Sequence, residues 1–173
     1  NISLNHSKRV AYVALNLARA FNLSAQELSD LCSYSLVHSI ALCKTKSKNE
    51  KYCILSDEYC SKLPFLTKKK NILKYQCEKY DGSGIFNIKG EDIPLMSQLI
   101  FFASFMDSKF DFSKDSIENR EEIKKFVKQN ENKLFSSDIV EVFMFLSSQT
   151  NFWLELQNES EMMYFIFSAI QDL

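Results

Sequence analysis

The stretch LMSQLIFFASFMD, residues 95–107, is apolar on nearly every side of a helix. Because such a helix has no face suited to water, we predict that it is the buried central helix of a bundle. Pro94 precedes the stretch and suits the first turn of a helix, where its missing backbone N–H is not needed. The apolar run is too short to cross a bilayer, and Ser97, Gln98 and Ser104 interrupt it.

The segment before this stretch predicts two long helices. The first has apolar residues at the spacing typical of a one-sided helix: Val10, Val13, Ala14, Leu17 and Phe21. Ser24 and Glu27 form a capping box that starts the second helix, whose buried stripe includes His38 and continues to Leu42. A lysine-rich connection, residues 44–51, follows, and we expect it to be a solvated loop.

Further helices are predicted on both sides of a glycine-rich loop. Residues 53–63, which end at Pro64, and residues 67–79 each predict a helix. The three glycines of the chain all lie in residues 80–92, so this segment must turn in ways that the rest of the chain cannot. Capping patterns predict three more helices: residues 120–131 with Asn119 and Glu122, a helix from Ser136, and a helix from Asn158 and Glu161 to about residue 171.

The composition fits one globular domain. The chain has 173 residues, of which 46% are hydrophobic and 25% charged, so it can bury a sizeable core. With no internal repeat and no dividing linker, we predict an all-α, single-domain bundle of about seven or eight helices over residues 1–173. The formal net charge of −1 creates no strong field, so we expect neither nucleic acid nor an anionic membrane as a partner.

The cysteines and the first residues indicate a compartment. The five cysteines show no C-x-x-C spacing, which favours reduced thiols over a disulfide framework: Cys32, Cys43, Cys53, Cys60 and Cys77. The polar residues 1–9 show no signal-peptide pattern. We therefore expect a cytoplasmic protein.

Two strings resemble a known family. His6-Ser7-Lys8-Arg9-Val10-Ala11 and, near the end of the next helix, His38-Ser39 resemble the HD superfamily of metal-dependent phosphohydrolases. Glu78-Lys79-Tyr80-Asp81-Gly82-Ser83-Gly84, continuing to Pro94, resembles the glycine loop of the HD-GYP subfamily. The resemblance runs in order over residues 6–107, whereas residues 119–171 match nothing diagnostic. The resemblance implies an HD-domain-like fold. It also implies that this chain is a degenerate member of the family, of the clostridial type.

The resemblance also implies a chemistry for which this chain lacks most residues. In the family, histidines and aspartates hold two or three metal ions, often iron or manganese, that activate a water for hydrolysis of cyclic di-GMP. This chain keeps His6, His38 and the supporting carboxylate Glu78. The other positions carry Ser39 for an aspartate, Tyr52 for a histidine, Gln76 and Cys77 for a histidine pair, and Ser104 for an aspartate. We therefore expect no catalytic residues, no metal and no other cofactor.

The histidine count supports this expectation, because a dinuclear site of this kind needs about four or five histidines. The chain has two, and both lie on apolar stripes where core histidines are common. One alternative stays open. His6, His38 and Cys77, with Asp107 as a carboxylate, are ligand types that can hold a single zinc, iron or manganese ion.

We predict a catalytically inactive, bacterial HD-GYP-like signalling domain that acts as a regulatory, interaction or sensing module. One alternative is a residual metal-dependent phosphodiesterase acting on cyclic di-GMP or another phosphodiester. A second is a module that binds a cyclic dinucleotide without hydrolysing it. We rank the second lower, because metals hold much of the phosphate charge in the family.

The C-terminal third indicates a partner. It has more large apolar side chains than one helix face can bury: Phe143, Phe145, Phe152, Trp153, Leu154, Met162, Met163, Phe165 and Phe167. Most of these should be core, and a surplus on the surface would mark contact with a protein partner, an adjacent domain or a second copy in a homodimer. In the family, an acidic ligand and more helix often precede the position of His6, so we expect a domain of a longer chain.

Overall fold

The computed structural model describes residues 5–171, which form nine α-helices, a single 3₁₀ turn and no β-strand. The helices are α1 (His6–Ala18), α2 (Ala25–Val37), α3 (Leu42–Thr45), α4 (Glu50–Cys60), α5 (Leu95–Phe110), α6 (Ile117–Gln129), α7 (Ser137–Ser147), α8 (Thr150–Gln157) and α9 (Glu159–Ile170), and the turn is Gly90–Asp92. Of these helices, α3 is a single turn. The prediction of an all-α, single-domain bundle is confirmed.

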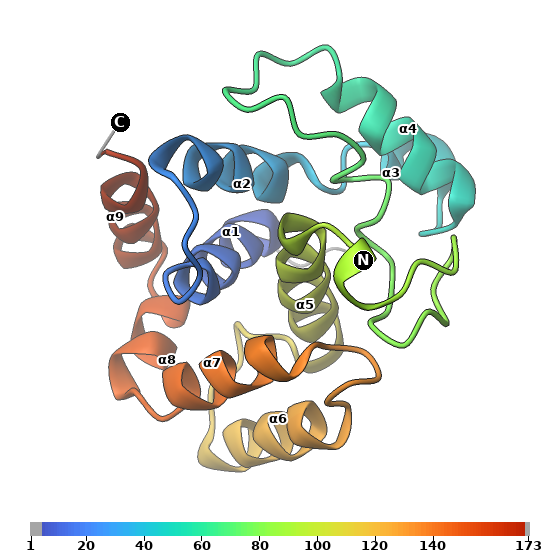
Figure 1. The fold of residues 1–173 in the computed structure, drawn as a ribbon. Coiled ribbons are helices and arrows are strands. Elements are labelled where there is room, and N and C mark those ends of the chain that lie inside the picture. The colour runs from blue at the N-terminus through green and yellow to red at the C-terminus, as the bar shows by residue number, and fades with distance from the viewer. Residues whose placement is uncertain (1–4, 172–173) are drawn as a thin grey trace.

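Helices α1 and α5 form the centre of the bundle (Figure 1). Helix α1 packs against α2, α5, α7 and α9, and its residues from Arg9 to Ala18 are all buried. Helix α5 is buried from Met96 to Ser104, as the apolar stretch predicts. Pro94 lies at the N-cap of α5, one residue before the predicted first turn, with an extended ψ of 135°. The two central helices therefore provide the rigid frame for the polar side chains described below.

Several helix starts confirm the predicted caps. The capping box of Ser24 and Glu27 starts α2, the Ser136 hydroxyl accepts the backbone N–H of Ile139, and Asn158 caps α9. Helix α6 begins earlier than predicted, because Ser116 takes the extended conformation and its hydroxyl accepts the backbone N–H of Asn119. The prediction that Asn119 caps this helix was therefore wrong, because Ser116 is the N-cap.

The predicted helix at residues 67–79 was also wrong. The segment is irregular, and side chains from other elements bond to its backbone groups in place of intrahelical partners. The buried Asp30 carboxylate accepts the N–H groups of Leu66 and Thr67, at 2.8 and 2.7 Å. The Ser97 hydroxyl donates to the carbonyl of Ile72, at 2.7 Å. Two short helices, α3 and α8, were not predicted.

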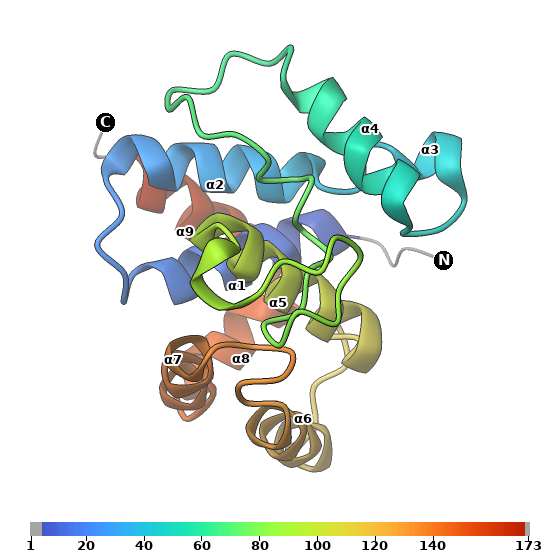
Figure 2. The same cartoon turned by 45° about the vertical axis from the view of Figure 1, so that its right-hand side comes forward.

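The arrangement places a smaller apolar cluster away from the main core. Ala41, Tyr52 and Cys53 form this cluster with partly buried side chains that include Ile85 and Phe86 of the glycine loop. Figures 1 and 2 show α3 and α4 at one end of the molecule and α6 at the opposite end. Within residues 5–171, no helix combines the length and the apolar character needed to cross a bilayer.

Candidate functional site

Polar side chains from α1, α5 and the end of α2 meet inside the bundle. His6, His38, Ser104 and Asp107 are all buried, and His38 is fully inaccessible. The two histidine rings lie 5.1 Å apart between their centroids. The structure thus brings together residues that are up to 101 positions apart in the chain.

The carboxylate of Asp107 is already occupied by protein donors. It bonds His6 Nδ1 at 2.5 Å and Arg9 Nε at 2.7 Å, and Arg9 Nη2 adds a third contact at 3.1 Å. The backbone N–H of Phe112 donates to it as well. Burial raises the pKa of Asp107, but the hydrogen bonds from His6 and Arg9 outweigh burial and lower it. Asp107 is therefore an anion neutralised by Arg9.

His38 is neutral and has both ring nitrogens in hydrogen bonds. Its Nδ1 donates to the carbonyl of Ser35 at 2.7 Å, which leaves Nε2 as an acceptor. The Ser104 hydroxyl lies 3.2 Å from Nε2 and donates to it. Burial lowers the pKa of His38 to about 3. The ring is therefore held in one tautomer by two partners of the chain itself.

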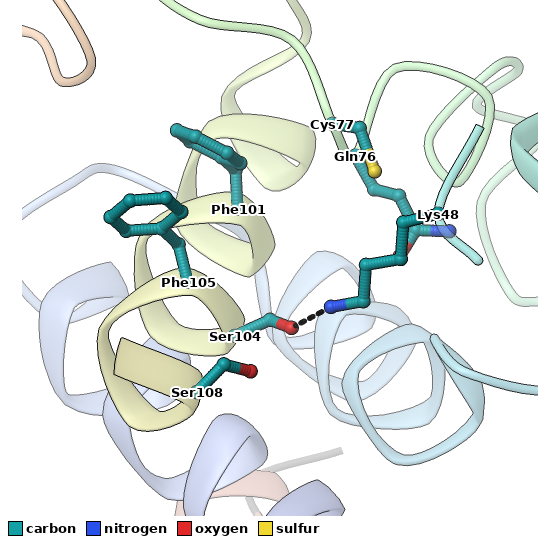
Figure 3. A pocket seen from close by; sticks show the side chains of 7 residues that line it. All are labelled: Lys48, Gln76, Cys77, Phe101, Ser104, Phe105 and Ser108. Atoms are coloured by element: carbon teal, nitrogen blue, oxygen red, sulfur yellow. Dashed lines mark hydrogen bonds between the residues drawn. The ribbon is translucent and has the colours of Figure 1, made fainter. Parts of the chain in front are cut away.

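Lys48 completes this chain of hydrogen bonds. Its Nζ donates to the Ser104 hydroxyl at 2.9 Å (Figure 3). Ser104 in turn donates to His38. Lys48 is exposed as a residue, but its ammonium group points inward, and burial of that group lowers its pKa. The prediction that residues 44–51 are a solvated loop was wrong for this side chain. Nothing in the sequence distinguishes Lys48 from Lys44, Lys46 or Lys51.

A cavity of about 230 Å³ opens beside this chain of hydrogen bonds. Figure 3 shows the side chains that line it: Lys48, Gln76, Cys77, Phe101, Ser104, Phe105 and Ser108. Gln76 is buried, and its Nε2 has no hydrogen-bond partner within residues 5–171. An unpaired buried amide N–H is costly, so it marks a place where a ligand or a water would be stabilised.

The remaining predicted site residues have separate positions. The Tyr52 hydroxyl donates to the carbonyl of His38 at 2.6 Å, and burial raises the pKa of this phenol. Ser39 is partly exposed and does not line the cavity. Glu78 is buried and accepts the backbone N–H groups of Phe86 and Ile88, at 2.8 and 3.0 Å, so it shapes the glycine loop.

The glycine loop is a structural turn around Glu78. A Cβ on Gly84 would lie 2.8 Å from the Glu78 backbone and carboxylate, so only glycine fits there. Gly82 has a φ of +85°, which other residues rarely adopt. The N–H groups of Gly82 and Ser83 bond within the loop. These bonds leave them unavailable as a nest for a phosphate.

The donor set does not fit a pair of metal ions. Among the residues that the structure describes, no three side chains of His, Cys, Asp or Glu are grouped to hold a metal. Asp107 is paired with Arg9, and His38 Nδ1 is turned toward the carbonyl of Ser35. The Lys48 ammonium adds a positive charge beside Ser104, where the resemblance expects an aspartate.

Comparisons with known proteins place the fold. No family model and no curated protein matches the chain. Among solved structures, the chain is similar to V-cGAP3, a cyclic GMP-AMP-specific phosphodiesterase in V. cholerae, with a TM-score of 0.78 and 16% identity. The fold is HD-domain-like.

The structural similarity extends over nearly the whole of this chain but over only part of V-cGAP3. The alignment covers 97% of this chain and 49% of V-cGAP3, so the chain spans about half of that protein's length. At 16% identity the likeness shows the fold and not the activity. The fold predicted from the two motif strings is confirmed, and the roles of individual residues rest on the geometry above.

Proposed function

We propose that this chain is a catalytically inactive, HD-GYP-like signalling domain that regulates or senses through binding rather than hydrolysis. The observation that carries the proposal is the Lys48 ammonium, which lies 2.9 Å from the Ser104 hydroxyl and next to neutral His38. A catalytic site of the kind that the resemblance implies needs anionic ligands around its cations. Here the Lys48 ammonium, a cation of the protein itself, lies beside Ser104, at the position where the resemblance expects an aspartate.

Electrostatics supports this proposal. A divalent ion about 4 Å from an ammonium group is repelled by about 8 kcal/mol at an effective dielectric constant of about 20. The Asp107 carboxylate, which acts on His38, offers little compensation because Arg9 already neutralises it. The neutral side chains Tyr52, Gln76 and Ser104 supply no further negative charge. The pocket therefore disfavours two adjacent metal ions on charge alone.

Hydrolysis assays test the proposal against the alternative of a residual phosphodiesterase. The substrates are cyclic di-GMP, cyclic GMP-AMP and bis(p-nitrophenyl) phosphate, each with added manganese, ferrous iron or zinc. We expect the parent and a His38→Ala variant to show the same background rate. Hydrolysis by the parent that is lost in His38→Ala, while circular dichroism shows that the variant is folded, would establish the enzyme.

A second candidate function, binding of a cyclic dinucleotide without hydrolysis, gains support from Lys48 and the unpaired amide of Gln76. Both line the cavity, and both can donate hydrogen bonds to a phosphate oxygen. At about 230 Å³, the cavity suits one phosphate group rather than a whole dinucleotide. Calorimetry with cyclic di-GMP and cyclic GMP-AMP tests it. Binding should weaken in Lys48→Met but not in Lys44→Met, and heat equal to dilution in the parent would remove this candidate.

The surface of the C-terminal helices supports a protein partner, an adjacent domain or a homodimer. Phe143, Phe152 and Trp153 are buried as core residues. Phe145 and Phe167 are 67% and 53% exposed, which is unusual for such large apolar side chains. Sedimentation velocity of the parent and of a Phe145→Ser, Phe167→Ser double variant tests self-association. We also propose a cytoplasmic protein of which residues 1–173 are one domain.

A further inference from the structure

The ammonium group of Lys48 lies at the cavity without an anionic partner. Its Nζ bonds to the Ser104 hydroxyl at 2.9 Å, and within residues 5–171 it forms no ion pair with a carboxylate. No aspartate or glutamate is among the described residues that line the cavity. A cation that is removed from water is costly unless a negative charge compensates it. The cavity therefore has a place for a negative charge that these residues do not supply.

A second hydrogen-bond donor of the cavity is also unused. Gln76 is only 4% exposed, and its Nε2 has no hydrogen-bond partner within residues 5–171. Ser108, one turn after Ser104 on α5, adds a hydroxyl group to the same lining. An ammonium group and an amide N–H can only donate hydrogen bonds. The ligand that suits these groups is therefore an acceptor with a negative charge.

Two aromatic rings form the apolar part of the lining. Phe101 and Phe105 lie on successive turns of α5, and their ring centroids are 5.4 Å apart. Figure 3 shows both rings on one side of Ser104 and Lys48 on the other side. Aromatic rings pack well against a flat apolar group. A fitting ligand thus combines an anionic group for Lys48 with an apolar body for the rings.

Charge and size favour a small monoanion in this cavity. The single ammonium group of Lys48 balances one negative charge, whereas a phosphate dianion would keep an uncompensated charge in a partly buried site. A carboxylate carries one charge and offers two acceptor oxygens. The volume of about 230 Å³ is about eight times that of one water in the liquid, which suits a molecule of about ten non-hydrogen atoms.

We propose that this cavity binds a small aromatic carboxylate, whose oxygens accept hydrogen bonds from Lys48 and Gln76 and whose ring packs against Phe101 and Phe105. The inference rests on the proposed function, because it needs a pocket without metal ions, and it names the class of ligand that a sensing module would detect. It differs from the cyclic-dinucleotide candidate in the size and charge of the ligand. Because Lys48 precedes α4 and the two rings belong to α5, the ligand joins these two parts of the molecule.

Isothermal titration calorimetry of the full chain with sodium benzoate, benzamide and inorganic phosphate at neutral pH tests the inference. We expect benzoate, with about nine non-hydrogen atoms, to bind with a Kd of about 1 mM. Benzamide has nearly the same shape without the charge, so it should bind about tenfold more weakly, as should phosphate. Lys48→Met should weaken benzoate binding about tenfold, whereas Lys44→Met, at an exposed lysine, should leave it unchanged.

Binding of benzamide as tight as that of benzoate would overturn the inference, and this comparison needs no variant. Parent-like affinity for benzoate in Lys48→Met, folded by circular dichroism, would overturn it too. Phosphate binding tighter than benzoate binding would replace the carboxylate with a phosphate-bearing ligand. Metal retained in the same protein would overturn the proposed function and this inference together. A metal-free protein that gives no heat with benzoate at about ten times the expected Kd would overturn this inference alone.

Discussion

At the scale of single residues, burial keeps His38 neutral and Lys48 brings a positive charge into the pocket. Its ammonium group donates to Ser104, which donates to His38, so the imidazole must present a free lone pair at Nε2. His38 uses its only proton on the carbonyl of Ser35. Each hydrogen bond in the series from Lys48 through Ser104 and His38 to Ser35 therefore has one direction. Protonation of His38 at Nε2 would remove the acceptor for Ser104 and break the series.

The protonation of His38 gives a prediction for stability against pH. Its pKa is about 3 in the folded protein and about 6.5 in the unfolded chain. Its contribution to stability is therefore complete above pH 6.5 and is lost as the pH falls toward 3. Between pH 6 and pH 4.5 we expect the free energy of unfolding to fall by about 1–2 kcal/mol more in the parent than in His38→Gln.

Urea unfolding at several pH values measures this difference. The other charged groups near His38, which are Lys48, His6 and Asp107, are present in both proteins, so their titration cancels in the comparison. Equal slopes in the parent and His38→Gln would mean that His38 titrates normally in the folded state.

Glu78 gives a second prediction at this scale. Its buried carboxylate accepts two backbone N–H groups of the glycine loop, and an amide can accept only with its oxygen. Glu78→Gln should lower the free energy of unfolding by about 1.5–3 kcal/mol. The control Glu91→Gln, at an exposed position in the same loop, should change it by less than about 0.5 kcal/mol. Similar values for the two variants in urea unfolding would contradict the role given to Glu78.

At the scale of elements, local signals predict helix starts and long-range contacts decide the rest. Ser24, Ser136 and Asn158 cap their helices through residues two or three positions ahead, so the sequence predicts them. The irregular segment at residues 67–79 depends on Asp30, which is 36 or 37 positions away along the chain. Its local pattern is helical, and no local feature reveals the competing carboxylate.

The same distinction applies to the site. His38, Gln76 and Ser104 stand at positions where the resemblance places metal ligands, and two of the three residue types are poor ligands, so the sequence predicts a pocket with few metal ligands. The position of Lys48 does not follow, because its bond to Ser104 spans 56 residues. Only the folded arrangement of α4 and α5 shows which lysine of a basic loop turns inward.

Asp30 gives a prediction for the irregular segment. Asp30→Asn replaces a carboxylate that accepts two backbone N–H groups with an amide that has one acceptor oxygen. We expect a loss of about 1–3 kcal/mol in the free energy of unfolding, together with faster proteolysis within residues 66–75. Asp81→Asn, at an exposed turn, is the control and should leave both measurements nearly unchanged. Unchanged proteolysis in Asp30→Asn would show that other contacts hold the segment.

At the scale of the whole molecule, the two apolar clusters predict unequal stability. The main cluster joins α1 and α5 to the C-terminal helices, whereas the small cluster around Tyr52 supports α4. We expect the amides of α4 to exchange through local openings. The free energy of these openings should be lower than that of the openings of α5 by about 2 kcal/mol or more. Native-state hydrogen exchange followed by mass spectrometry measures both helices at once. Equal protection of α4 and α5 would indicate a single cooperative unit.

The central claim is that this HD-domain-like pocket is organised around the Lys48 ammonium instead of metal ions. Inductively coupled plasma mass spectrometry of the full chain, purified gently without chelators, tests it most directly. The account predicts much less than one equivalent of iron, manganese and zinc per chain. It also predicts no increase when these metals are added and excess ions are removed. One or two equivalents that remain bound, and that are lost in His38→Ala, would contradict it.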